Sequence, residues 1–145
     1  MLYGIDPMIG PDLLHALRAM GHGDEIAIVD ANYPATSKAK RLIRMDGHDA
    51  VKIADAVLSL MPLDTFVDHA AATMQVVGDP SAVPDIVGAF DAVIQKRQPG
   101  HSIEAVERFA FYARAEQAFA TIATGERRLY GNIILKKGVI RPADA

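Results

Sequence analysis

His22 is the side chain whose sequence context most directly suits proton transfer. The preceding residues, Pro11 to Met20, carry apolar side chains at helical spacing, and Gly21 is suited to the carboxyl cap of that helix. An imidazole at this point lies near the negative end of a helix dipole, which favours its protonated form. The position suits a general acid; a histidine that only caps the helix is the alternative that the local sequence leaves open.

Asp30 follows a short apolar run, Glu25 to Val29, that is typical of a buried strand. In open α/β sheets, ligands bind beyond the carboxyl ends of the strands, so this carboxylate is a candidate acceptor for a ligand's hydrogen bonds. The following Ala31-Asn32-Tyr33-Pro34 is equally typical of a turn that an aspartate side chain stabilises. A ligand contact and a structural turn are both open for Asp30.

Arg108 begins an aromatic segment for which the spacing predicts a helix, Arg108 to Gln117. We expect Phe109 and Tyr112 on one face, Phe111 on another, and most of this cluster in the core. The guanidinium of Arg108 suits a pair of adjacent hydroxyls, although an ordinary surface charge is the commoner role of an arginine. Tyr112 can offer either its hydroxyl to a substrate or its ring to the core.

Tyr130, Gly131 and Asn132 directly precede the last predicted strand. Gly131 permits a tight backbone turn, and the amide of Asn132 supplies both a hydrogen-bond donor and an acceptor. On local grounds alone, this tripeptide is an ordinary turn.

Alternating helices and strands must position these side chains, which predicts a layered α/β domain. Helices are expected at residues 11–20, 50–60, 83–96 and 108–117, and strands at residues 25–29, 41–45, 71–77, 119–123 and 132–136. Residues 97–101 are expected to form a surface connection within one domain. No internal repeat is visible.

The composition narrows the function classes. With 15 basic and 18 acidic side chains, the charge balance gives no reason to expect a nucleic-acid partner. The absence of cysteine excludes disulfides and thiolate chemistry and favours a reducing compartment, so the cytoplasm is the expected location. We find neither a secretory signal nor an apolar stretch that could cross a membrane.

Several cofactor and metal motifs are missing. The Gly21-x-Gly23 pair lacks the third glycine of a dinucleotide fingerprint and precedes a strand instead of following one. No P-loop, nucleophile elbow or zinc-protease motif occurs. The adjacent pairs His48-Asp49 and Asp68-His69 are better explained as surface loops than as metal ligands. We therefore expect no cofactor and no metal.

Five segments together resemble the fucose mutarotase and ribose pyranase family, whose enzymes interconvert sugar anomers without a cofactor. The similarity runs from Met1 to Val139 and rests on residues 21–24, 30–34, 108–115, 124–126 and 130–139. It implies a single domain over residues 1–145 with an RbsD-like fold, a three-layer α/β/α sandwich around a mixed sheet. It also implies a homo-oligomer with the site near a subunit interface.

The resemblance assigns roles to the residues named above. His22 matches the proton-transferring histidine of the family. The sugar-binding positions of the family match Asp30, Arg108, Tyr130, Gly131 and Asn132, with Tyr112 a further possible contact. Mutarotation opens a hemiacetal by moving one proton from the anomeric hydroxyl and another onto the ring oxygen, so positioned proton carriers suffice.

The sequence around Arg108 and Tyr130 favours the fucose branch of the family, and therefore L-fucose as substrate. Ala113 stands where that branch often has glutamate, which leaves the exact sugar open. D-ribose pyranase activity is the alternative within the family. A noncatalytic monosaccharide-binding or transport-accessory protein is the alternative from another class, and it would not need His22. An aldose isomerase would generally require a metal or a strong base.

Overall fold

A six-stranded mixed sheet forms the centre of the molecule. The computed structural model describes all of residues 1–145. The spatial order of the strands is β2 (Leu42–Met45), β5 (Ala120–Thr124), β1 (Glu25–Val29), β6 (Ile133–Lys136), β3 (Ala71–Met74) and β4 (Ile103–Val106). β6 is antiparallel to both of its neighbours, and the other pairs are parallel.

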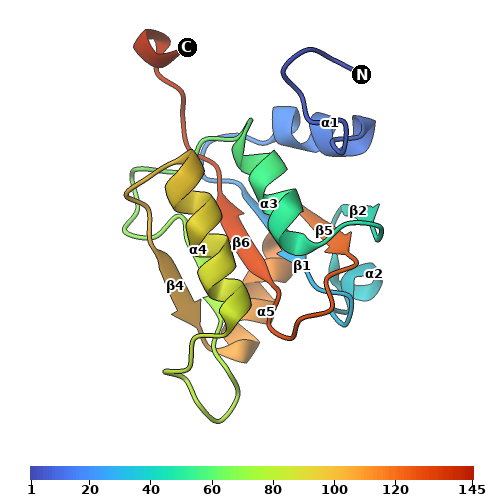
Figure 1. Cartoon of the computed structure of the whole chain (residues 1–145), viewed down its shortest axis with the longest axis vertical. Coiled ribbons are helices and arrows are strands. Elements are labelled where there is room, and N and C mark those ends of the chain that lie inside the picture. Colours follow the sequence, from blue (N-terminus) through green and yellow to red (C-terminus); the bar gives the residue numbers. More distant parts are fainter.

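Helices cover both faces of this sheet (Figure 1). On one face, α1 (Pro11–Ala19), α3 (Ala50–Leu58) and α4 (Asp85–Arg97) pack with the larger buried cluster, which includes Phe90 and Ile28. On the other face, α2 (Ala35–Lys38) and α5 (Arg108–Gln117) pack with a cluster that includes Phe111 and Val29. Successive strand residues point to opposite faces, so each buried strand supplies both clusters. The expected three-layer α/β/α sandwich is confirmed.

Most of the expected elements are present, with boundaries that differ by a few residues. Three were missed: the single-turn helix α2, the edge strand β4 and a 3₁₀ turn at Pro142–Asp144. β4 has only four residues, of which none is fully buried, so its sequence lacks the apolar run that marks the central strands. The expected strand at residues 71–77 ends already at Met74, and a turn follows it.

The end of α1 differs from the expected glycine cap. The helix ends at Ala19, and Met20 already has an extended backbone with ψ of 138°. Gly21 does not adopt the left-handed conformation of a capping glycine. The last carbonyls are instead satisfied by the Lys137 ammonium, which donates to Leu17 O at 2.7 Å and Met20 O at 2.6 Å. A lysine distant in sequence therefore caps this helix.

The strand directions divide the candidate residues between two edges of the sheet. The carboxyl ends of β1, β3 and β5 lie at the same edge as the amino end of β6, because β6 alone runs in the opposite direction. Asp30 and Asn132 therefore lie at this edge. His22 precedes β1 and lies toward the opposite edge, where β6 ends.

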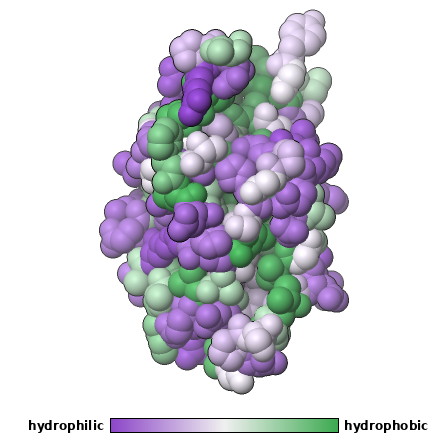
Figure 2. Space-filling view, turned by 90° about the vertical axis from the view of Figure 1, so that its left-hand side faces the viewer, coloured by the Kyte–Doolittle hydropathy of each residue, from purple (hydrophilic) through white to green (hydrophobic).

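The surface seen from one side mixes hydrophilic side chains with narrower hydrophobic strips (Figure 2). None of the helices is both long enough and apolar enough to span a bilayer.

Candidate active site

Asp30 and Asn132 form a reciprocal buried pair at the end of β1. The Asp30 backbone N–H donates to Asn132 Oδ1 at 2.8 Å, and Asn132 Nδ2 donates to Asp30 Oδ2 at 3.0 Å. The backbone N–H of Asn32 donates to Asp30 Oδ1 at 2.9 Å. Both side chains are buried, so this pairing holds them in one orientation. Each carboxylate oxygen keeps further lone-pair capacity for a ligand's hydroxyl group.

Tyr130 adopts the left-handed conformation in this site, with φ of 62°, and it is the only residue other than glycine to do so. Its hydroxyl accepts a hydrogen bond from the backbone N–H of Val77 at 3.1 Å. The φ of Gly131 is not positive, so this position does not need a glycine for its backbone angles. Gly131 is required for space instead: an added Cβ would lie 2.7 Å from Glu126 Cγ.

A cleft of about 220 Å³ opens at this edge of the sheet. Five of the predicted residues line it: Asp30, Arg108, Tyr112, Tyr130 and Asn132. They come from the loop after β1, from α5 and from the segment before β6. Gly131 is buried behind them. The cleft is completed by residues without a predicted role: Asn32, Tyr33, Met74, Val77 and Leu129.

Arg108 is presented to this cleft by the start of α5. The side chain of Glu107 caps the helix by accepting from the backbone N–H groups of Phe109 and Ala110, at 2.9 and 3.1 Å. The Arg108 guanidinium lies 4.6 Å from the centroid of the Phe109 ring. That ring is exposed, so the expectation that the aromatic cluster is mostly core is wrong for Phe109, whereas Phe111 is fully buried.

Tyr33, which the sequence did not single out, supports Tyr112. The two rings stack with their centroids 5.4 Å apart. The Tyr33 hydroxyl is buried and has no hydrogen-bond partner. Burial, followed by the nearby Tyr112 and Glu116, raises the pKa of Tyr33 to about 12. Tyr33 therefore remains a neutral phenol beside the cleft.

Glu126 organises the loop that carries Tyr130. Its carboxylate accepts from Arg128 Nε and Nη2, each at 2.9 Å, and from the backbone N–H of Ala50 at the start of α3. Its backbone carbonyl accepts from the N–H of Ala31 at 2.9 Å. The hydrogen bonds from the Arg128 side chain, which outweigh the opposing effect of burial, lower the pKa of Glu126 to about 2. Glu126 thus ties the loops on both sides of the cleft to α3.

His22 lies outside the cleft. It precedes β1, and the five residues of that strand span roughly 15 Å between it and Asp30. Its Nε2 is 3.0 Å from Oδ1 of Asp64, and its ring packs at 5.2 Å against the exposed Phe66. One chain alone therefore does not bring His22 together with the other predicted site residues.

Asp64 determines which nitrogen of His22 carries a proton. Burial opposes ionisation of this carboxyl, but hydrogen bonds from the Phe66 N–H and from His22 outweigh it, so the pKa of Asp64 is lowered. An ionised carboxylate only accepts hydrogen bonds, so His22 Nε2 must be the donor. Nδ1 is then the nitrogen that can exchange a proton. Only tertiary contact reveals this pairing, since 42 residues separate Asp64 from His22.

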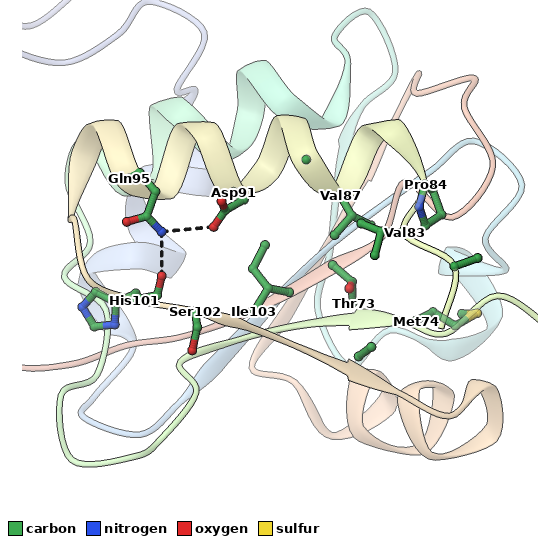
Figure 3. A pocket seen from close by; sticks show the side chains of 13 residues that line it. Thr73, Met74, Val83, Pro84, Val87, Asp91, Gln95, His101, Ser102 and Ile103 are labelled. Atoms are coloured by element: carbon green, nitrogen blue, oxygen red, sulfur yellow. Dashed lines mark hydrogen bonds between the residues drawn. The ribbon is translucent and has the colours of Figure 1, made fainter. Parts of the chain in front are cut away.

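A separate cavity of about 440 Å³ lies between α4 and the strands β3 and β4 (Figure 3). Apolar side chains such as Val83, Val87 and Ile103 form much of its wall. Gln95 Nε2 donates both to Asp91 Oδ1, at 3.0 Å, and to the His101 carbonyl, at 2.7 Å. No cluster of three or more metal-ligating side chains occurs in the chain. The cavity holds none of the predicted site residues.

Comparison with known proteins identifies the family of this chain. Residues 3–140 match the model of the RbsD / FucU transport protein family. Human fucose mutarotase is 41% identical, with 96% of this chain and 94% of that protein covered. The chain therefore belongs to the RbsD / FucU family.

Two solved structures are similar over nearly the whole chain. The structure of the fucose mutarotase from Streptococcus pneumoniae in complex with L-fucose has 45% identity and a TM-score of 0.89, covering 97% of this chain and 100% of that one. A crystal structure described as a putative sugar binding protein has 39% identity and a TM-score of 0.93, covering 97% of both chains.

Proposed function

We propose that this protein is an L-fucose mutarotase, an isomerase that interconverts the α and β anomers of the sugar. The observation that carries the proposal is the buried Asp30–Asn132 pair at the base of a cleft of about 220 Å³. Fixed carboxylate and amide groups of this kind discriminate between hydroxyl configurations, which apolar burial cannot do. Arg108 and Tyr130 line the same cleft and complete the proposed sugar-binding set. The names of the similar proteins support the choice of sugar.

The reaction needs proton transfer and nothing more. One proton leaves the anomeric hydroxyl while another reaches the ring oxygen, the bond between that oxygen and the anomeric carbon breaks, and the free aldehyde rotates before the ring closes again. Each positioned acid or base contributes roughly 100-fold or more to the rate. We assign one of these proton transfers to Nδ1 of His22, with Asp64 holding the imidazole in the required tautomer.

The separation of His22 from Asp30 supports a site built by two copies of the chain. We propose a homo-oligomer in which His22 of one copy faces the Asp30 cleft of another. Apolar side chains are exposed in both regions: Phe66 beside His22, and Val77 and Leu129 at the cleft. Such a head-to-tail contact closes into a ring when its rotation allows. We place the enzyme in the cytoplasm, as the lack of cysteine suggests.

Anomer exchange measured by proton NMR tests the activity. Magnetisation transfer between the α and β signals of L-fucose is expected to accelerate in the presence of the protein, and His22→Gln should nearly abolish that acceleration while binding remains detectable. Faster anomer exchange for D-ribose but not for L-fucose would assign the protein to the pyranase branch. Binding of L-fucose without acceleration would favour the noncatalytic sugar-binding alternative, which the description of one similar structure also supports.

Co-expression tests the shared site. His22→Gln and Asn132→Ala should each be inactive alone. If every site combines the two residues from different copies, mixed oligomers recover up to about a quarter of the native activity, because random assembly pairs two intact halves in that proportion. Isolated hetero-oligomers that remain inactive would contradict the shared site.

A further inference from the structure

The loop after β3 contains a turn whose backbone points at the cleft. Asp79 N–H donates to the Val76 carbonyl at 3.1 Å, and Gly78 has φ of 81°. Val77 does not have a positive φ, because Tyr130 is the only non-glycine residue that does. A four-residue turn in which only the third residue has a positive φ is a type II turn. Val77 is the second residue of this turn.

This turn fixes the role of the Tyr130 hydroxyl. The Val77 N–H donates to the hydroxyl oxygen at 3.1 Å, and no other protein group bonds that oxygen. A phenol has one proton of its own and accepts through the oxygen lone pairs. Because Val77 occupies the accepting side and no protein group accepts the phenolic proton, that proton is available to a ligand in the cleft that Tyr130 lines.

We infer that the Val77 N–H positions Tyr130 as the proton donor to the bound sugar, which makes the β3–α4 turn part of the proton-transfer machinery. This inference rests on the proposed mutarotase function. In the ring-opening direction, the Tyr130 proton passes to the ring oxygen, which keeps the electron pair of the breaking bond. His22 Nδ1 takes the proton of the anomeric hydroxyl as the carbonyl forms. Ring closure returns both protons.

The Val77 N–H contributes most when Tyr130 has lost its proton. A hydrogen bond to a phenolate is charge-assisted and about twice as strong as a bond to the neutral phenol. The group therefore stabilises the charge that develops during the reaction more than it stabilises the resting state. We expect its removal to slow exchange about 10-fold with little effect on sugar affinity. Val77 itself is a positioning residue.

The turn type offers a variant that removes only the donor. Proline is favoured at the second position of a type II turn and lacks the N–H, so Val77→Pro should keep the backbone and delete the hydrogen bond. Val76 pairs with Asp79 in an isolated β-bridge, an extended conformation that a following proline accepts. Val77→Ala is the matched control: it removes the exposed side chain and keeps the N–H.

The test compares L-fucose exchange in these variants, alone and combined with Tyr130→Phe. We expect Val77→Pro to have a maximal exchange rate about 10-fold below that of Val77→Ala at nearly constant KM. In the Tyr130→Phe background, the two substitutions should give the same rate. The inference would be overturned if the proline and alanine variants exchanged at equal rates. It would also be overturned if Val77→Pro lowered the rate as much in the Tyr130→Phe background as in the native protein. A native protein that accelerates neither L-fucose nor D-ribose would refute the proposed function instead.

The hydrogen bond has a readout independent of activity. In the amide NMR spectrum, Tyr130→Phe should shift the Val77 signal and speed its hydrogen exchange, because the N–H then faces solvent. An unchanged Val77 amide would show that the bond does not form in solution, and the inference would fail whatever the enzyme activity.

Discussion

Replacing Glu126 by glutamine is expected to destabilise the protein at neutral pH and much less in acid. The substitution keeps the shape of the side chain but removes the charge that accepts hydrogen bonds from Arg128 and from the Ala50 N–H. Because an amide NH₂ group cannot accept, one of these donors loses its partner. The loop leading to Tyr130 is anchored by this carboxylate, so the effect reaches the cleft.

The magnitude follows from the pKa of Glu126. A decrease from 4.5 to about 2 corresponds to about 3 kcal/mol of stabilisation. The side chain of Arg128 is 49% exposed, so solvent screens part of the interaction, and we expect about 2 kcal/mol. Because the pKa is lower in the folded state, this stabilisation is fully present above pH 4.5 and is lost as the pH falls toward 2.

Urea unfolding followed by circular dichroism at several pH values measures this difference. The free energy of unfolding of the native protein should exceed that of Glu126→Gln by about 2 kcal/mol at pH 7. This difference should shrink steadily below pH 4.5. Glu116→Gln is the matched control, since Glu116 pairs with Lys38 at the surface and should matter by less than about 1 kcal/mol. A gap of equal size at pH 7 and near pH 2.5 would refute the electrostatic reasoning.

Four further substitutions test other parts of the structure. Tyr33→Phe removes a buried hydroxyl without a partner and should raise the free energy of unfolding by about 1 kcal/mol in urea titrations; a loss would indicate an unseen partner. Gly131→Ala should lower the free energy of unfolding by about 1–3 kcal/mol, because its methyl group would lie 2.7 Å from a neighbouring carbon. Gly88→Ala, in open space on α4, should instead raise the free energy of unfolding by about 0.5–1 kcal/mol. Thermal unfolding temperatures in the opposite order would contradict the packing argument. Asp64→Asn should lower the exchange rate more than it lowers sugar affinity, and it should change the pH dependence of the exchange rate, because the tautomer of His22 is no longer held. An unchanged pH dependence would show that Asp64 does not act in catalysis.

The sequence by itself determined the fold class, most of the helices and strands, and the family. Local patterns carry this information: the apolar run before Asp30 specifies a buried strand, and helical spacing specifies α1 and α5. It also identified five residues that line the cleft, since Asp30 and Asn132 follow and precede strands and the others belong to family motifs. Their roles in binding and catalysis remain predictions, as does a single domain over residues 1–145.

Only the tertiary structure decided which of these residues meet. Asp30 and Asn132 are 102 residues apart, and they pair because β6 lies antiparallel to β1 and begins where β1 ends. The same strand directions place His22 at the opposite edge, where a buried aspartate 42 residues away fixes its tautomer. Strand order and direction depend on the packing of both helical layers, which no local pattern specifies. For that reason the sequence could name His22 as a candidate proton carrier, but it could not identify Asp64 as its partner or show that His22 and Asp30 lie at opposite edges of the sheet within one chain.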